Sequence, residues 1–241
     1  MILKLLIDFQ EVFQLLIIFF SELDRLSKIM NKGKFITIEG GEGTGKSTQL
    51  NLLSYYLRKK KIKNLTTREP GGSIGAEKIR KLILNSKKKD WSPITEALLH
   101  ISARSDHIEK KVLPNLNKGI WIICDRFRDS TIVYQGYGNG LKLDVLEILQ
   151  ESIFNKLHAD LTIILDANPK ITLKRTKKRK FGNQKYEKMN INFHKKIRHG
   201  FLEIAKKNKK RCKIVNAVGN KKEINKKIIE IIKKQFRSKN L

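Results

Sequence analysis

A glycine-rich segment directly after a short apolar run constrains the fold of this chain more than any other feature. Residues 35–38 read Phe-Ile-Thr-Ile, a β-rich run that stops at Gly40. From Gly40 the chain continues Gly-Gly-Glu-Gly-Thr-Gly-Lys-Ser, which fits the pattern G-x-x-x-x-G-K-[ST]. Leu50, Leu53 and Leu57 then follow helical spacing. A strand, a glycine loop and an amphipathic helix in this order predict a loop that cradles phosphate groups.

Each residue type in this loop has a chemical reason. Glycines let the chain curl so that backbone N–H groups approach phosphate oxygens, and the helix that follows adds its positive end. Lys46 is predicted to reach the β- and γ-phosphates, and the Ser47 hydroxyl to ligate Mg²⁺. A chance glycine-rich turn is the alternative, but the strand before and the helix after favour a nucleoside triphosphate site. The residues expected to bind ATP are Gly40, Gly41, Glu42, Gly43, Thr44, Gly45, Lys46, Ser47 and Thr48.

Three arginines stand where a parallel sheet would bring them to one edge. Arg68 ends a strand expected over residues 64–68, and Arg126 follows a strand expected over residues 120–124. Arg104 lies on a helix expected from about residue 93 to residue 117. Open α/β sheets bind ligands at the carboxyl ends of their strands, and guanidinium groups can grip phosphates with two hydrogen bonds. A surface ion pair is the alternative for any one arginine, but the three together favour a convergent anion site.

Taken together, these segments resemble the thymidylate kinases, a family of P-loop nucleoside monophosphate kinases. The resemblance runs from about Lys34 to the C-terminus, in the family's order and spacing. Its Arg-Glu-Pro-Gly-Gly and Tyr-Gln-Gly pieces are specific to the family, whereas a glycine loop alone occurs in many nucleotide-binding proteins. The matching segments are Phe35–Gln49, Thr67–Gly72, Ala103–Arg104, Asp125–Arg126, Ser130–Thr131, Tyr134–Gly136 and Asp160–Asp166.

The resemblance implies phosphoryl transfer from ATP to dTMP, with Mg²⁺ as cofactor. At the phosphate end it implies that Arg68 and Arg126 hold the dTMP phosphate in line with the γ-phosphate. Asp125 is expected to organise Mg²⁺ together with Ser47. Glu42, inside the glycine loop, resembles the bacterial-type enzymes, in which this position faces the acceptor.

At the nucleobase end, the resemblance implies that Arg104 and Thr131 hydrogen-bond the thymine edge, with Gln135 nearby. Ser130 belongs to the same expected substrate site. Tyr134 is expected to crowd the 2′ position and so favour deoxyribose. A kinase for another nucleoside monophosphate, or for pyrimidines in general, is the alternative, and it would need different donors and acceptors at these positions.

His100 departs from the family pattern, which usually has a stacking phenylalanine at this position. An imidazole ring can stack on thymine, but it buries less area and can become charged. His100 is therefore an expected substrate contact. A histidine that belongs only to the core or to the helix surface is the equally weighted alternative.

A basic lid is expected over about residues 174–187. Mobile cations can stabilise the charge that spreads over the phosphoryl group in flight. The resemblance assigns this role to Arg175, Lys177 and Arg179, although the sequence Gln-Lys-Tyr-Glu at residues 184–187 departs from the family's Asp-Arg-x-Glu. A solvated basic loop is the alternative. The residues expected to act in catalysis are Lys46, Arg126, Arg175, Arg179 and Glu42.

The order of the predicted elements indicates an α/β protein with the P-loop NTPase fold. It comprises a five-stranded parallel sheet flanked by helices, plus the mobile lid. Apolar runs at residues 120–124 and 161–165 are typical of parallel strands that are buried on both faces. One domain is expected over residues 30–241, and the family resemblance implies a homodimer.

The charge balance is lopsided, with 52 Lys and Arg against 23 Asp and Glu and a formal net charge of +29. A nucleic-acid-binding ATPase is one interpretation. However, no aromatic stacking motif is interleaved with the C-terminal lysines, and Tyr186, Phe193 and Phe201 are expected in packing. No specific nucleic acid is therefore expected as a partner. The two cysteines are expected to be buried apolar residues, which fits a cytoplasmic protein.

The first 29 residues are expected to be an apolar extension that is not part of the native enzyme. Charged residues at positions 4, 8 and 11 interrupt the apolar run, and the longest uninterrupted stretch, residues 15–20, is far too short to span a bilayer. Acidic residues inside the run and the lack of a small-residue cleavage site also disfavour a secretory signal. An amphipathic surface helix stays open. No membrane partner is expected.

Overall fold

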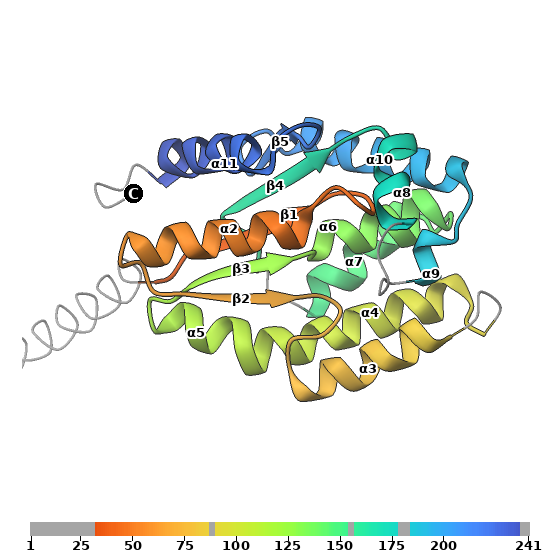
Figure 1. The fold of residues 1–241 in the computed structure, drawn as a ribbon. Helices are drawn as coiled ribbons and strands as arrows, with labels where there is room; N and C mark the ends of the chain where they lie inside the picture. Colours follow the sequence, from red (N-terminus) through yellow and green to blue (C-terminus); the bar gives the residue numbers. More distant parts are fainter. Residues whose placement is uncertain (1–31, 87–89, 154–156, 178–183, 237–241) are drawn as a thin grey trace, which may run out of the picture.

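The computed structural model describes residues 32–86, 90–153, 157–177 and 184–236. Five parallel strands form one sheet in the order β2-β3-β1-β4-β5 (Figure 1). This confirms the predicted five-stranded parallel sheet. The expected extension over residues 1–29 lies outside the described residues. The strands are β1 (Phe35–Glu39), β2 (Asn64–Arg68), β3 (Trp121–Asp125), β4 (Leu161–Asp166) and β5 (Cys212–Asn216).

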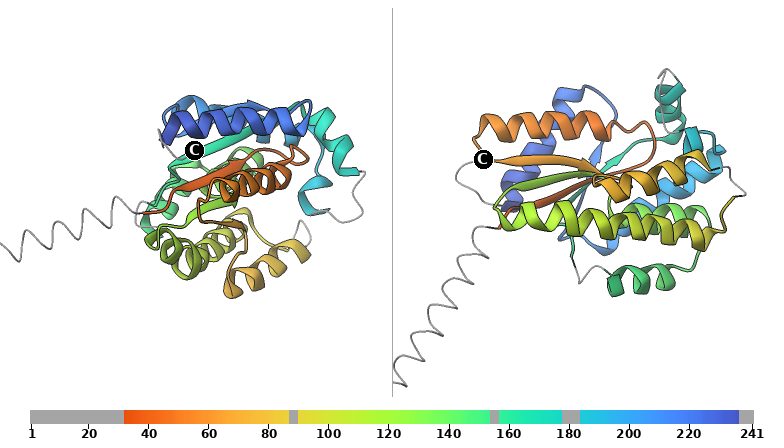
Figure 2. Two further views of the ribbon diagram at one scale, coloured as in Figure 1. Left: turned by 60° about the vertical axis from the view of Figure 1, so that its left-hand side comes forward. Right: turned by 90° about the horizontal axis from the view of Figure 1, so that it is seen from below.

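Helices cover both faces of the sheet (Figure 2). Successive side chains of a strand point to opposite faces, so the near-continuous apolar runs of β1, β3 and β4 make both faces of the sheet apolar. Ile36 and Ile38 of β1 pack with α2 and α11, whereas Phe35 packs with α4 and α5 on the other face. The helical segments are α2 (Lys46–Lys59), α3 (Ile74–Asn85), α4 (Pro93–His107), η1 (Ile108–Val112), α5 (Leu113–Asn117), α6 (Arg128–Thr131), η2 (Ile132–Gly138), α7 (Leu143–Ile153), α8 (Pro169–Lys177), α9 (Gln184–Glu187), α10 (Ile191–Lys207) and α11 (Lys221–Phe236).

Some predicted element bounds differ from the structure by a residue or a turn. The strand expected from Ile120 begins at Trp121, because the Ile120 N–H closes the preceding helix on the Asn115 carbonyl. The helix expected over residues 93–117 is interrupted by the wider π-helical turn η1, just before Pro114. Proline cannot donate to the helical ladder, which explains irregular hydrogen bonding near it.

The structure also tests the predicted burial of the two cysteines and the predicted packing of three aromatic residues. Cys124 and Cys212 are free and buried, as expected. Tyr186, Phe193 and Phe201 are buried in one apolar cluster, which confirms their expected packing role. In the part of the chain that the structure describes, no helix combines the length and the apolar character that crossing a bilayer requires.

Candidate active site

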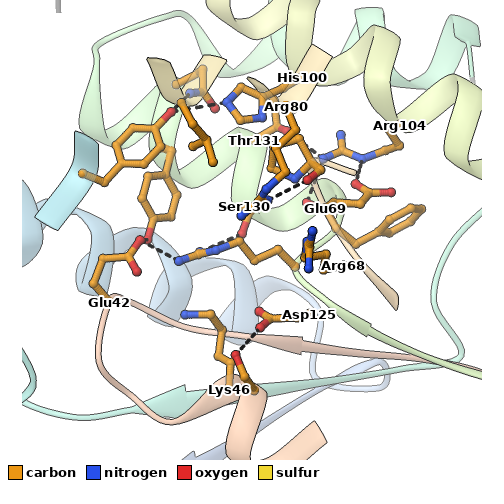
Figure 3. A pocket seen from close by; sticks show the side chains of 18 of the residues that line it. Glu42, Lys46, Arg68, Glu69, Arg80, His100, Arg104, Asp125, Ser130 and Thr131 are labelled. Carbon is orange, nitrogen blue, oxygen red and sulfur yellow. Dashed lines mark hydrogen bonds and ion pairs between the residues drawn. The ribbon is translucent and has the colours of Figure 1, made fainter. Parts of the chain in front are cut away.

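The carboxyl ends of β1, β2 and β3 open onto one pocket, as expected for an open α/β sheet. Figure 3 shows Lys46 and Asp125 at one end of this pocket and His100 at the other. The residues that line it are Glu42, Gly43, Gly45, Lys46, Ser47, Arg68, Glu69, Pro70, Arg80, Leu84, His100, Arg104, Asp125, Arg126, Phe127, Ser130, Thr131, Tyr134, Gln135, Tyr186 and Glu187. The three arginines, which come from distant parts of the chain, therefore line the same pocket as Lys46.

The glycine loop curls around the amino group of Lys46. Lys46 donates to the carbonyl oxygens of Gly40 at 3.1 Å and Gly41 at 2.9 Å. Gly45 has a φ of 93°, a left-handed conformation that glycine adopts without strain, and it starts α2. Burial and the nearby Arg126 charge lower the pKa of Lys46. The loop thus concentrates donors and a buried cation at the start of a helix, which suits a polyphosphate.

A serine and an aspartate face each other at the mouth of the loop. The Ser47 hydroxyl donates to Asp125 Oδ2 at 2.9 Å. The other carboxylate oxygen, Oδ1, is buried and has no hydrogen-bond partner among the described residues. Because Mg²⁺ prefers hydroxyl, carboxylate and water oxygens, this pair and its unpartnered oxygen fit a Mg²⁺ site.

Arg126 is held in place by groups from three elements. It donates to Glu42 Oε1 at 2.7 Å and to the Ser130 hydroxyl at 3.2 Å, and its guanidinium carbon lies 4.8 Å from the ring centre of Tyr134. Tyr134 also donates to Glu42 at 3.0 Å. Burial favours a neutral Glu42, but the Arg126 and Lys46 charges outweigh it and lower the pKa of Glu42. Glu42 therefore stays ionised and orients Arg126 before any ligand arrives.

Glu39, at the end of β1, binds the segment that directly follows Arg126. It accepts from the Phe127 N–H at 2.7 Å and from the Ser130 hydroxyl at 2.6 Å. Burial, with the Asp129 charge, raises the pKa of Glu39 to about 7. The sequence analysis missed Glu39. Its signal was an acidic residue at the last position of an otherwise apolar buried strand.

Arg104 lies at the centre of a buried polar network. It donates to Glu69 at 2.5 Å, to Gln150 at 2.7 Å, to the Phe127 carbonyl at 3.0 Å and to Thr131 at 2.9 Å. The side chain is only 2% exposed. Arg104 therefore joins α4, α6 and α7 and orients Thr131 within the pocket.

Glu69 was missed by the sequence analysis, although it follows Arg68 directly. Its second carboxylate oxygen bonds to the buried ring of His107, which in turn bonds to Thr67. Burial favours a neutral Glu69, yet the Arg104 charge and the His107 contact lower its pKa. Glu69 thus holds the Arg104 guanidinium by one oxygen and the β2 end by the other.

The end of the pocket far from Lys46 carries a second polar network. The Tyr186 hydroxyl donates to Glu96 Oε1 at 2.5 Å, and Gln135 Nε2 lies 3.3 Å from the same hydroxyl. His100 Nε2 also lies 3.3 Å from it. Lys185 forms an ion pair with Glu96 Oε2 at 2.8 Å. Glu96, Lys185 and the Tyr186 hydroxyl were all missed, because α4 and α9 are about 90 residues apart in the sequence and no spacing rule joins them.

Comparison with known proteins decides the family. A family model described as thymidylate kinase matches residues 38–228. The thymidylate kinase of Caulobacter vibrioides is 43% identical over 188 residues, which are 78% of this chain and 90% of that protein. The thymidylate kinase of Afipia carboxidovorans is 40% identical over 209 residues, covering 86% of this chain and 92% of that protein.

The fold agrees with these sequence matches. The crystal structure of thymidylate kinase from Ehrlichia chaffeensis superimposes with a TM-score of 0.67 at 31% identity, covering 83% of this chain and 99% of that one. The chain belongs to the thymidylate kinase family. The expected P-loop NTPase fold and the resemblance are thereby confirmed.

Two arginines lie at the β2 side of the pocket. Arg68 donates to Glu77 at 3.1 Å and is 56% exposed, so it can exchange this partner for an anion at little cost. Arg80, from α3, donates to the Pro70 carbonyl at 2.7 Å and also lines the pocket. The sequence analysis predicted Arg68 and missed Arg80, which carried no motif of its own.

Other predicted residues lie at the edge of the site or outside it. Thr48 is exposed in the first turn of α2, one residue after Ser47. Arg175, on α8, donates to the Ala217 carbonyl at 3.1 Å and does not line the pocket. Arg179 lies outside the described residues. The roles assigned to these residues in nucleotide binding and in the lid stay predictions.

Proposed function

We propose that this chain transfers the γ-phosphoryl group of ATP to the phosphate of dTMP, yielding dTDP and ADP. A phosphate oxygen of dTMP forms the new bond to the γ-phosphorus, and the bond from that phosphorus to the bridging oxygen breaks. The observation that carries this function is the joint lining of one pocket by Lys46, Arg68 and Arg126, with hydrogen-bonding side chains at its far end.

The cationic groups of the pocket match the needs of phosphoryl transfer. Lys46 would bind the triphosphate tail, and Arg126, held by Glu42, would bind the dTMP phosphate beside it. Because Arg126 is oriented in advance, binding loses little conformational entropy and the two phosphates are brought into line. Arg68 would leave Glu77 to contact the same phosphate, and Arg175 and Arg179 would close over it.

Ser47 and Asp125 would hold Mg²⁺, the hydroxyl directly and the carboxylate through its unpartnered oxygen or a bound water. When bound, the ion neutralises charge on the β- and γ-phosphates. Asp125 therefore has its role at the triphosphate, whereas Arg126, the next residue, faces the acceptor.

At the nucleoside end, Thr131, Gln135 and Arg104 would contact the base. Arg104 donates to the Thr131 hydroxyl oxygen and so fixes the position of that oxygen. Tyr134 packs between Glu42 and Tyr186 and would leave no room for a 2′-hydroxyl. These positions support thymidine monophosphate over other acceptors.

Parallel acceptor assays test this function. ADP release would be measured with ATP and Mg²⁺ against dTMP, dUMP, UMP, CMP, AMP and GMP. We expect dTMP to give the highest kcat/KM. Preference for another monophosphate would overturn the acceptor assignment, and ATP hydrolysis that needs DNA instead of any monophosphate would overturn the kinase assignment.

The family resemblance supports a homodimer. Apolar side chains on α3 and α4 are exposed in the single chain, among them Ile74 at 82%, Leu82 at 55% and Leu98 at 42%. Burial of such side chains between two copies would remove them from water. Light scattering coupled to size exclusion tests this proposal, and a monomer at micromolar concentration would contradict it.

A further inference from the structure

The Tyr186 hydroxyl has more neighbours than a packing role requires. It lies within hydrogen-bond distance of Glu96, Gln135 and His100, which come from α4 and η2. Its ring is buried, edge-on to Tyr134 at 4.9 Å and stacked on Phe193 at 6.3 Å. Packing thus fixes the ring, and the three polar partners converge on one oxygen.

The donors and acceptors around this oxygen can be counted. Glu96 is ionised, since hydrogen bonds from Lys185 and Tyr186 outweigh its burial and lower its pKa, so it can only accept. The single hydroxyl proton of Tyr186 therefore points to Glu96. Gln135 offers an NH₂ group, which can only donate, and it takes one lone pair of the hydroxyl. His100 Nε2 must then donate to the remaining lone pair, so it carries the ring proton.

The charges around His100 agree with a neutral ring. Glu96 and Arg104 on α4, Lys185 on α9 and Glu69 after β2 all act on it. Burial lowers the pKa of His100 to about 4, with Arg104 and Lys185 acting in the same direction. At neutral pH the ring is therefore uncharged, and the hydrogen-bond count places its one proton on Nε2.

We propose that Tyr186, oriented by Glu96, is a positioning residue that locks His100 as the neutral Nε2–H tautomer and presents its flat ring to the nucleobase. The proposal rests on the proposed function, because a nucleobase must occupy this end of the pocket (Figure 3). The family pattern usually has a phenylalanine at this position. Here the imidazole of His100 takes its orientation from a hydrogen bond instead. It also ties α9, the last part of the expected lid, to the acceptor site.

Two readouts test this proposal. In ¹⁵N-labelled full-length protein without ligand, two-bond proton–nitrogen correlations identify the His100 tautomer, with His100→Phe to assign the signals. We expect Nε2–H in the wild type and a mixture of tautomers in Tyr186→Phe, which keeps the ring but removes the hydroxyl. A charged or Nδ1–H imidazole in the wild type at pH 7 would overturn the proposal.

Kinetics provide the second readout. Tyr186→Phe should raise the KM for dTMP about threefold to tenfold with kcat within about twofold, as the loss of one hydrogen bond predicts. In the His100→Phe background the same change should have no further effect on KM. Equal effects in both backgrounds would show that Tyr186 acts without His100 and would contradict the proposal.

The matched control is Tyr137→Phe, since Tyr137 lies on η2 but outside the pocket and packs against His199. It should leave both readouts unchanged. A wild type that does not phosphorylate dTMP would refute the proposed function, whereas the tautomer is measured without any substrate. The two failures can therefore be told apart.

Discussion

At Arg126 the chain leaves β3 with a φ of 71°, a left-handed conformation that is uncommon outside glycine. This backbone turn directs the side chain back over the glycine loop, where Glu42 binds it. The Glu42 charge raises the pKa of Arg126 against the opposing effect of burial, so the guanidinium stays charged. One residue thus combines a strained backbone with a fixed cation, an arrangement that suits a functional site.

Glu42→Gln should reduce kcat/KM for dTMP by roughly tenfold to hundredfold. The amide keeps an oxygen acceptor but removes the charge that orients Arg126, and a charge-assisted hydrogen bond contributes more than a neutral one. Steady-state kinetics at saturating ATP measure this effect. Glu230→Gln, on the exposed side of α11, is the matched control. An unchanged kcat/KM would mean that Arg126 does not depend on Glu42.

Arg179→Ala should lower kcat much more than it changes the affinity for dTMP. A lid arginine acts on the charge of the transition state, which the ground state lacks. Turnover and dTMP binding would be measured separately, with the exposed Arg58→Ala on α2 as the control. Equal losses in turnover and in affinity would contradict a transition-state role.

At the scale of elements, the residues at the carboxyl ends of the strands supply many of the side chains that line the pocket. The apolar interiors of β1, β3 and β4 could be predicted from short local apolar runs, and the glycine loop from its residue pattern. The placement of Arg68 and Arg126 at one pocket also followed from the parallel order of strands, and that of Arg104 from the helix between them in the sequence. The partners of these arginines could not be predicted, because contacts such as Glu69 with Arg104 depend on side-chain directions that only the folded sheet and helices fix.

Glu39 at the end of β1 should make stability depend on pH. Its pKa is raised from 4.5 to about 7, so the folded chain holds this proton more tightly than the unfolded chain. The contribution of this proton to the free energy of unfolding is therefore fully present below pH 4.5. It is lost as pH rises toward 7, by up to about 3 kcal/mol. Glu39→Gln should flatten the decline in unfolding free energy over this window, as measured by urea denaturation. An unchanged slope would exclude Glu39 as the titrating group.

At the scale of the whole molecule, the net charge of +29 and the enzyme site are separate features. The pocket cations have defined partners, whereas many lysines of α10 and α11 are exposed on helix faces. Such charges attract polyanions without sequence preference and in a salt-dependent way. They give no reason to expect that a nucleic acid reaches the catalytic groups.

DNA should therefore leave ATP turnover unchanged. Weak retention on DNA at low salt is expected and should vanish with added salt, while ADP release with dTMP stays within about twofold at every DNA concentration. Parallel retention and ADP-release assays over a salt series measure both effects. Stimulation of ATP hydrolysis by DNA in the absence of dTMP would contradict this separation.

The contact between the glycine loop and α8 leaves no clearance. A Cβ atom at Gly43 would lie 2.2 Å from the carbonyl oxygen of Thr172. The glycine loop and α8, the helix that precedes the basic segment, are therefore packed so closely at Gly43 that only a hydrogen atom fits between them. A side chain at position 43 would force the loop and α8 apart, so a substitution there should disturb the Lys46 loop and the position of Arg175 on α8 together.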